Sequence, residues 1–139
     1  MPERGHCPIS FALDVIGDKW SLIVIRDMAF FEKRYYRQFL DAGEGIATNI
    51  LSERLRRLER EGIISKQVDP ENRSKIIYSL TDKGIDLVPM LVDLIHWGAK
   101  HDCQTAAPAE FLERIENDRD NLITEFQTRL RSSKISPAD

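Results

Sequence analysis

One stretch of the sequence limits what this chain can fold into more than any other does. It runs from Gly45 to Gly62 and reads GIATNILSERLRRLEREG. Wound into a helix at about 100° per residue, it places three leucines on one narrow arc and its long polar side chains opposite. The leucines are Leu51, Leu55 and Leu58, and the polar side chains are Asn49, Glu53, Arg56 and Arg60. Thr48 and Ser52, in the first turns, are small enough to let a duplex approach closely. The pattern fits a recognition helix, because amides, hydroxyls and guanidinium groups read base edges in the major groove.

An ordinary amphipathic helix with a solvated basic face would show the same pattern, so the neighbouring segments decide. Residues 33–40 read as a short helix, and the glycine-containing turn at residues 41–45 makes it one half of a helix-turn-helix pair. Its apolar contacts are expected to be Tyr35, Tyr36 and Phe39. Residues 63–68 and 75–80 read as two strands joined by the turn sequence DPEN. A two-stranded hairpin directly after a helix-turn-helix is a wing.

Two helices are expected before this motif. Pro8 opens the first, which ends before Gly17, and Asp18 is the expected N-cap of the second, at residues 19–31. The apolar run inside residues 19–31 indicates a buried helix, although a buried strand would show a similar run. The first helix is apolar on more than one side, which indicates that it also packs against a second body.

Two further helices are expected after the hairpin. Thr81 caps a long one at residues 82–100, which Pro89 should kink near Ile85. Its apolar side chains cover more of its circumference than one core needs, which usually indicates a partner. Residues 109–131 form the last amphipathic helix. The predicted fold class is therefore mainly α with a small β-hairpin: a winged helix-turn-helix with a C-terminal helical extension.

The formal net charge of −3 does not favour a nucleic-acid partner, because counterion release rewards a basic surface. The charge is unevenly distributed, however. Residues 1–101 carry 15 basic and 15 acidic side chains, and residues 102–139 carry 5 and 8. The central basic cluster comprises Lys33, Arg34, Arg37, Arg54, Arg56, Arg57, Arg60, Lys66, Arg73 and Lys75. A local basic surface is therefore compatible with the acidic total.

The composition argues against several other classes of protein. No window approaches the roughly 18 apolar residues of a membrane span, and the first ten residues lack the apolar run of a secretory signal. Cys7 and Cys103 do not make a disulfide framework and fit a reducing compartment, so we expect a cytoplasmic protein. No motif for an enzyme or a cofactor is present. His96 and His101 are five residues apart and do not share a helix face, so no metal site is expected.

Four segments in a fixed order resemble one family. They are CPISFALDVIGDKWSLIVIRDM, ILSERLRRLEREGII, YSLTDKG and the tryptophan of IHWG, within about residues 7–98. They resemble the HxlR-type winged helix-turn-helix transcription regulators, a bacterial and archaeal group related in architecture to the MarR regulators. The resemblance implies a homodimer joined by the first and the long helices. It also implies that residues 48–61 enter the major groove and that the wing, residues 69–75, reaches the backbone or minor groove. Relatives often have serine where Ala47 stands, so Thr48 or a bare backbone must start the helix here.

The candidate DNA-binding residues are Thr48, Asn49, Ser52, Glu53, Arg56, Arg60, Arg73 and Lys75. Arg56 is a candidate base-reading fork, Arg60 a phosphate contact and Asn49 an adenine reader. Glu53 is expected to orient Arg56 or Arg57, or to accept a hydrogen bond from cytosine. The two wing side chains are phosphate candidates.

Cys7 is a candidate redox sensor. It directly precedes Pro8 at a helix N-terminus, where the helix dipole and free N–H groups favour a thiolate. The resemblance adds that several relatives sense electrophiles or oxidants with a cysteine at this position. The alternative is a small, half-buried residue of no functional consequence.

We expect residues 1–103 to form the DNA-binding and dimerisation domain and residues 104–139 a helical extension packed on it. A lone amphipathic helix is marginal in water, so the extension should dock on the long helix. Its acidic side chains should keep it away from DNA. It would then strengthen dimerisation or roof a cavity for a small apolar effector.

The function favoured by these patterns is a sequence-specific DNA-binding transcriptional regulator that acts as a homodimer on a pseudo-palindromic operator. The alternative is a protein–protein interaction module that uses a winged-helix body without binding DNA. That alternative predicts no salt-dependent DNA binding.

Overall fold

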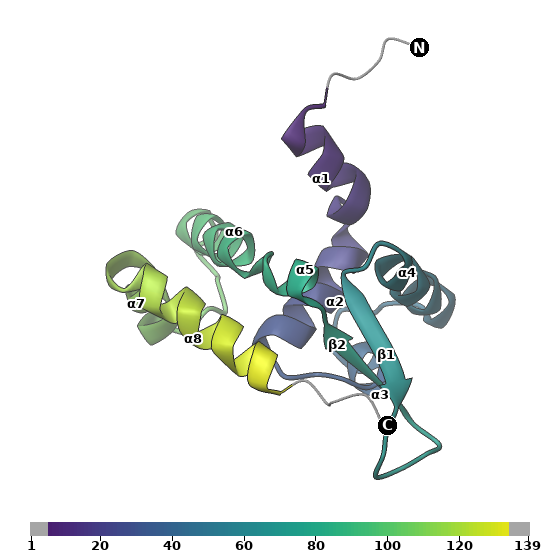
Figure 1. The fold of residues 1–139 in the computed structure, drawn as a ribbon. Coiled ribbons are helices and arrows are strands. Elements are labelled where there is room, and N and C mark those ends of the chain that lie inside the picture. Colours follow the sequence, from purple (N-terminus) through teal and green to yellow (C-terminus); the bar gives the residue numbers. More distant parts are fainter. Residues whose placement is uncertain (1–5, 134–139) are drawn as a thin grey trace. The chain divides into compact units, whose positions relative to one another are not determined.

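The computed structural model of the chain describes residues 6–133 (Figure 1). Those residues belong to two compact units, with the boundary between Thr81 and Asp82. The predicted domain boundary lies after residue 103, so the long-helix segment, which the prediction groups with the DNA-binding domain, lies in the second compact unit. The functional division at residue 103 stays a prediction.

The first unit is a winged helix-turn-helix, as predicted. Its elements in chain order are α1 (Pro8–Ile16), α2 (Lys19–Phe30), α3 (Tyr36–Leu40), α4 (Thr48–Arg60), β1 (Ile64–Val68) and β2 (Ile76–Leu80). The two strands are antiparallel, with Ile64 opposite Leu80 and Val68 opposite Ile76. The loop between them projects beyond the hairpin as the wing (Figure 1).

The core of this unit follows from the apolar spacing of α4. Leu51, Leu55 and Leu58 are all buried, and α4 packs on α2, α3 and β1. Val24 and Ile25 of α2 are buried as well, so the apolar run in that segment is a buried helix rather than a strand. The helix-turn-helix and the wing therefore share one apolar core, which fixes α4 relative to the hairpin.

Two local signals explain where helices of this unit begin and end. Asp18 caps α2 as predicted, since its Oδ2 accepts a hydrogen bond of 3.0 Å from the backbone N–H of Ser21. Gly62, with φ +74°, follows the end of α4 in the left-handed conformation that glycine adopts without strain. At the start of α4, Ala47 provides no side-chain cap, so the bare backbone begins the helix.

The predicted third helix begins too early. It was expected from Lys33, but α3 starts at Tyr36. The side-chain oxygen of Gln38 accepts hydrogen bonds from the backbone N–H groups of Arg34 and Tyr35, at 2.8 and 3.1 Å. These bonds satisfy both donors outside a helix, so residues 33–35 form the approach to α3 rather than its first turn.

The second unit is helical: α5 (Asp82–Ile85), α6 (Val88–His101), α7 (Ala109–Asn117) and α8 (Arg119–Ser132). Two sequence predictions are corrected here. The long helix at 82–100 is broken rather than kinked, because Pro89 has no N–H to donate to the carbonyl four residues earlier. The single helix predicted at 109–131 is interrupted at Asp118, whose φ and ψ of −147° and 36° are not helical. Side chains of Arg114 and Asn121 donate to the Asp118 carboxylate and hold this corner.

The C-terminal extension docks on the long-helix segment, as expected. Both α7 and α8 pack on α6, and α8 also packs on α5. Ile115, Leu122 and Ile123 are buried there, and Arg119 adds two hydrogen bonds of 2.8 Å to the carboxylate of Asp93 on α6. Across residues 6–133, none of the helices has the length and apolar character that a membrane span requires.

Candidate nucleic-acid interface

The outward face of α4 carries the predicted contact residues together. Thr48, Asn49, Arg56 and Arg60 are exposed, and Ser52 and Glu53 are partly exposed. They share this face because the three buried leucines of α4 point the other way. The structure thus holds six of the eight candidates on one rigid helix.

The arginines of α4 fall into two groups with different roles. Arg54 donates from Nε to Oδ2 of Asp18 at 2.7 Å and also pairs with Glu53. Arg57 donates to the backbone oxygen of Asp14 at 2.6 Å and approaches Oδ1 of Asp18 at 3.5 Å. These two arginines tie α4 to the last turn of α1 and to the N-cap of α2. In the described part of the chain, by contrast, no carboxylate pairs with Arg56 or Arg60.

The expected role of Glu53 is therefore wrong in one respect. Glu53 was expected to orient Arg56 or Arg57, but its carboxylate pairs with Arg54. Arg54 is the residue next to Glu53, and its guanidinium also donates to Asp18. Burial raises the pKa of Asp18, but hydrogen bonds from Ser21 and Arg54 outweigh it and lower the pKa to about 2. Asp18 is therefore a fixed negative charge that neutralises arginines beside it.

Tyr36, which the sequence predicts only as an apolar contact, lies beside the candidate residues. Its hydroxyl donates to the backbone oxygen of Thr48 at 3.2 Å and accepts from Oγ of Ser52 at 3.4 Å. A shallow cavity of about 210 Å³ lies beside it. The cavity is lined by Tyr36, Ser52, Leu55, Arg56, Glu59, Lys66 and Tyr78. No sequence signal marks Tyr36, because a tyrosine at an apolar helical position is usually a core residue.

The N-terminus of α4 offers further donors. Because Ala47 supplies no side-chain cap, the first N–H groups of α4 are not satisfied by a local side chain. Such groups point along the helix axis and favour an anion, and phosphate is one. Hydrogen-bond donors are thus present at the N-terminal turn of α4 and, further along the helix, on its outward arginines.

The wing carries the remaining two candidates. Arg73 and Lys75 are both exposed on the loop between β1 and β2. The loop is held in shape by its own hydrogen bonds: Asn72 Oδ1 accepts from the backbone N–H and the hydroxyl of Ser74, at 3.2 and 2.7 Å. The ammonium of Lys75 lies 5.0 Å from the centroid of the Tyr35 ring. The wing is thus a loop with its own internal hydrogen bonds, and it exposes two basic side chains although its acidic and basic residues balance.

Cys7 is the N-cap residue of α1 and is exposed. Hydrogen bonds from the backbone N–H groups of Ser10 and Ile9, and from the Ser10 side chain, lower the pKa of its thiol. A thiol of this kind holds more thiolate at neutral pH, and the thiolate is the nucleophilic form. The geometry expected from the sequence at this position is present.

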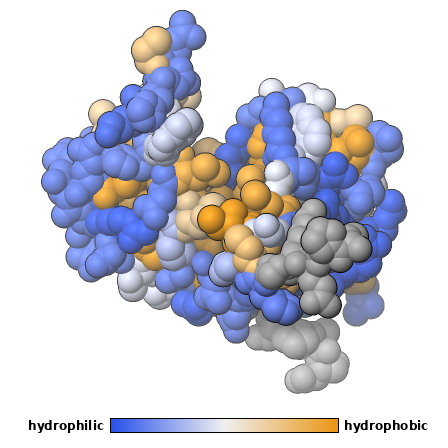
Figure 2. Space-filling view, turned by 90° about the horizontal axis from the view of Figure 1, so that it is seen from above, coloured by the Kyte–Doolittle hydropathy of each residue, from blue (hydrophilic) through white to orange (hydrophobic). Residues whose placement is uncertain are grey.

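Apolar side chains are exposed on one helix of each unit. On α1, Ile9, Phe11 and Leu13 are 71%, 65% and 60% exposed, and on α6 Leu94 and Trp97 are 48% and 66% exposed. Figure 2 shows hydrophobic side chains open to view among hydrophilic ones. Clusters of this kind on a single chain usually mark a surface that another molecule covers.

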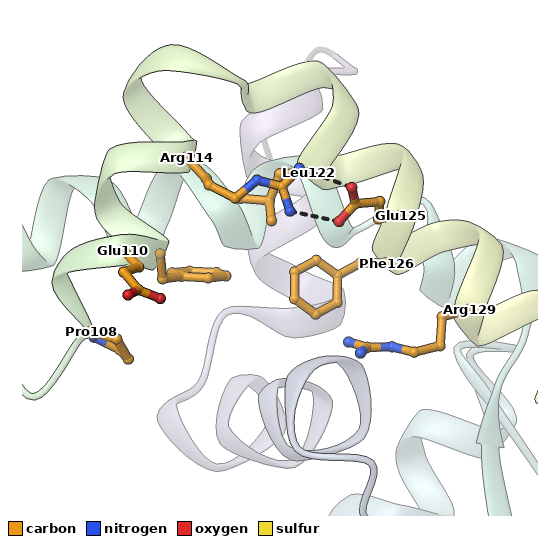
Figure 3. A pocket seen from close by; sticks show the side chains of 8 residues that line it. Pro108, Glu110, Arg114, Leu122, Glu125, Phe126 and Arg129 are labelled. Atoms are coloured by element: carbon orange, nitrogen blue, oxygen red, sulfur yellow. Dashed lines mark hydrogen bonds and ion pairs between the residues drawn. The ribbon is translucent and has the colours of Figure 1, made fainter.

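A second cavity, of about 470 Å³, lies between α7 and α8 (Figure 3). The rings of Phe111 and Phe126 meet edge to face there, with centroids 6.0 Å apart. Arg114 donates to Glu125 at 2.6 and 3.0 Å and to Asp118 at 2.8 Å, so its charge is used within the unit. These hydrogen bonds from Arg114 to the carboxylates of Glu125 and Asp118 raise the pKa of Arg114. Within residues 6–133, histidine, cysteine and acidic side chains do not gather into a group able to hold a metal ion.

Comparison with known proteins agrees with this geometry. An HTH-type transcriptional regulator of Synechocystis sp., itself uncharacterized, is 41% identical over 98 residues, which cover 70% of this chain and 72% of that protein. The HTH-type transcriptional regulator YodB of Bacillus subtilis is 32% identical over 66% of this chain and 70% of its own length.

Solved structures show the same likeness. The redox regulator HypR in its oxidized form superposes with a TM-score of 0.62 and 33% identity, over 69% of this chain and 98% of that one. The family described as HxlR-like helix-turn-helix matches residues 15–106. That match includes α4, the wing and the exposed apolar face of α6. The chain is a transcriptional regulator of the helix-turn-helix type, not an enzyme, and it belongs to the HxlR-like helix-turn-helix family.

Proposed function

We propose that this regulator binds double-stranded DNA sequence-specifically, with α4 in the major groove and the wing on the backbone or in the minor groove. The observation that carries the proposal is the division among the arginines of α4. The carboxylate of Asp18 pairs with Arg54 and Arg57, and Arg57 also donates to the backbone oxygen of Asp14. In the described part of the chain, no carboxylate pairs with Arg56 or Arg60. An unpaired guanidinium beside exposed amide and hydroxyl groups is the arrangement that base edges and phosphates require.

Within this interface, Asn49 and Arg56 are the candidates for base contact, and Arg60, Arg73 and Lys75 are the candidates for phosphate contact. Thr48 and Ser52 are small, and they let the N-terminal turn of α4 approach the duplex. Glu53 remains a candidate to accept from cytosine, although its pairing with Arg54 ties up part of its carboxylate.

We also propose that the chain acts as a homodimer on a pseudo-palindromic site. The exposed apolar side chains of α1 and α6 support this, because they are surplus to the core of each unit. A two-fold dimer presents two copies of α4 to one face of the duplex, and its operator then mirrors that symmetry. The location that fits this role is the cytoplasm.

Redox control through Cys7 is a further part of the proposal. The lowered pKa and exposure of the thiol support it, as does the likeness to a protein named as a redox regulator. Treating the protein with a thiol oxidant should change its affinity for DNA, and Cys7→Ser should abolish the change while Cys103→Ser should not. An equal response in the Cys7→Ser variant would exclude this role.

The experiment that tests the central proposal is selection of bound fragments from random DNA with the purified full-length chain. An enriched inverted repeat would support sequence-specific binding by a symmetric dimer. Binding must also weaken steeply as salt increases, because phosphate contacts release counterions. A selection that enriches no sequence, with no salt-dependent binding, would favour the alternative of a protein–protein interaction module.

A small apolar effector, or a contribution of α7 and α8 to dimerisation, would act through the second unit. The cavity lined by Phe111 and Phe126 supports effector binding by its volume, which lies within the usual range for ligand sites. The docking of both helices on α6 supports the contribution to dimerisation, because α6 carries exposed apolar side chains.

A further inference from the structure

Tyr35 links the start of the helix-turn-helix to the wing. It lies in the connection between α2 and α3, directly before the first residue of α3. The wing loop runs between Val68, the last residue of β1, and Ile76, the first of β2. More than thirty positions of sequence separate Tyr35 from this loop, yet its side chain contacts both ends of it.

The contact at the start of the loop is a hydrogen bond. The Tyr35 hydroxyl donates to Oδ2 of Asp69 at 2.8 Å, and the other carboxylate oxygen accepts from the backbone N–H of Glu71 at 2.9 Å. Asp69 is only 5% exposed, although it lies in a wing that is otherwise exposed. A buried carboxylate must keep its hydrogen bonds, because leaving one unmade carries the cost of desolvation. Asp69 therefore joins Tyr35 to the turn.

The contact at the end of the loop is made by the ring of the same side chain. Lys75 places its ammonium 5.0 Å from the ring centroid, within the range of a cation–π interaction. The backbone N–H of Asp69 also donates to the oxygen of Lys75 at 2.9 Å, which closes the loop. Next to Tyr35, the oxygen of Arg34 accepts a 2.8 Å hydrogen bond from the backbone N–H of Tyr78 on β2.

We propose that Tyr35 is a positioning residue for DNA recognition, which clamps the base of the wing so that Arg73 is held at a fixed place relative to α4. The proposal rests on the proposed DNA-binding function. α3 packs directly on α4, so the residue before α3 moves little with respect to the reading helix. The clamp thus joins the two DNA-contacting elements through one side chain, and it sets the spacing between their contacts.

The clamp itself is tested without DNA, by amide hydrogen exchange on the full-length protein. Tyr35→Phe keeps the ring over Lys75 and removes the hydroxyl. Exchange at Glu71, Asn72 and Lys75 should become about 2- to 10-fold faster, the range given by the net loss of one hydrogen bond. The matched control is Tyr36→Phe, whose hydroxyl contacts α4 rather than the wing. Unchanged exchange in Tyr35→Phe would overturn the proposal.

The consequence for recognition is tested by a double-mutant cycle on a selected operator. Tyr35→Phe and Arg73→Ala should each weaken binding by about 2- to 10-fold, and the double variant should be little weaker than either. For Tyr35→Phe combined with Arg56→Ala, the fold-losses of DNA affinity should instead multiply, to within about twofold, as they do for independent sites. A variant that merely destabilised the fold would affect both pairs alike. The positioning role would therefore be overturned if the fold-losses of affinity multiplied in both cycles, or if both cycles showed the same coupling.

A second substitution protects the result against a local folding defect. Asp69→Asn keeps an oxygen that can accept from Tyr35, so it should weaken DNA binding less than Asp69→Ala does. Equal losses would count against the hydrogen bond as the clamp. Failure of the proposed function would look different, because the wild-type chain would then select no DNA sequence. Faster wing exchange in a protein that binds DNA with unchanged affinity would refute the positioning role alone.

Discussion

Replacing Asp18 by asparagine is expected to destabilise the winged helix-turn-helix unit by about 2 kcal/mol at neutral pH. Asp18 Oδ2 accepts from the backbone N–H of Ser21 and from Nε of Arg54, at 3.0 and 2.7 Å. Arg57 lies 3.5 Å from Oδ1. Asparagine can still cap α2 with its one oxygen, but it then turns an amide N–H₂ toward a guanidinium and loses the negative charge.

The magnitude follows from the pKa. The pKa of Asp18 falls from 3.8 to about 2, and a tenfold change in proton affinity is about 1.4 kcal/mol, so folding favours the ionised carboxyl by at most about 2.5 kcal/mol. Partial screening by solvent reduces this to about 2 kcal/mol. The side chain is 27% exposed, so solvent screening does not remove most of this energy. Asp18→Ala should cost about 1 kcal/mol more, because it also removes the helix cap.

The sign of the pH dependence is set by the lowered pKa. The contribution of Asp18 is present above the pKa of the unfolded chain, near 4, and is lost as the pH falls toward about 2. Urea unfolding at fixed protein concentration, at about pH 7 and about pH 2.5, measures it. The stability difference between the wild-type chain and Asp18→Asn should shrink at the lower pH.

The matched control is Asp41→Asn, an exposed aspartate of the same unit without an ion pair in the described part of the chain. It should change stability by less than about 0.5 kcal/mol. Equal stabilities of wild type and Asp18→Asn at neutral pH would refute the reasoning, as would a difference that stays the same at both pH values.

Three further outcomes are expected. Arg56→Ala should cost on the order of 1–3 kcal/mol of binding free energy and relax specificity at one operator position, whereas Arg73→Ala should weaken all sequences about equally; unchanged affinity in both variants would mean that another face binds DNA. Phe11→Asp should shift the sedimentation of a micromolar sample from dimer toward monomer, and a wild-type chain that sediments as a stable monomer would exclude the dimer. A chain ended after Asp102 should melt at a lower temperature and dimerise more weakly, with its operator contacts unchanged. If it melts and dimerises like the full-length chain, α7 and α8 do not contribute to stability or dimerisation.

The sequence alone was sufficient for the parts of the fold that depend on neighbouring residues. The spacing of Leu51, Leu55 and Leu58 determined both the helix and its buried face, because helical periodicity is a local property. Asp18 as a cap and Gly62 as a stop are equally local, since a cap bonds within three residues and a positive φ depends on one. The family resemblance added the order of the elements, and the family match supports it.

Predictions were less accurate where a local pattern fitted two outcomes. Proline inside an apolar helical run can kink a helix or end it, and Pro89 opens α6 instead of bending one long helix. The apolar spacing from Ala109 onward fitted one helix, but α7 and α8 are separate. Packing of both halves on α6 decided this, and the ion pairs of Arg114 stabilise the corner at Asp118.

The partners of the arginines on α4 were decided only by the tertiary structure. Arg54 and Arg56 are two positions apart on one basic helix, and helical periodicity already places Arg56, but not Arg54, on the outward arc. The carboxylate that holds Arg54 belongs to Asp18, 36 positions earlier, and the carboxylate that holds the wing to Tyr35 belongs to Asp69, 34 positions later. Helical periodicity gives the direction in which a side chain points, but only the folded core brings distant charges to it. Whether an arginine stays available for DNA depends on the charges that the folded core brings close to it. A nearby carboxylate accepts the hydrogen bonds that the arginine would otherwise donate to a phosphate or a base.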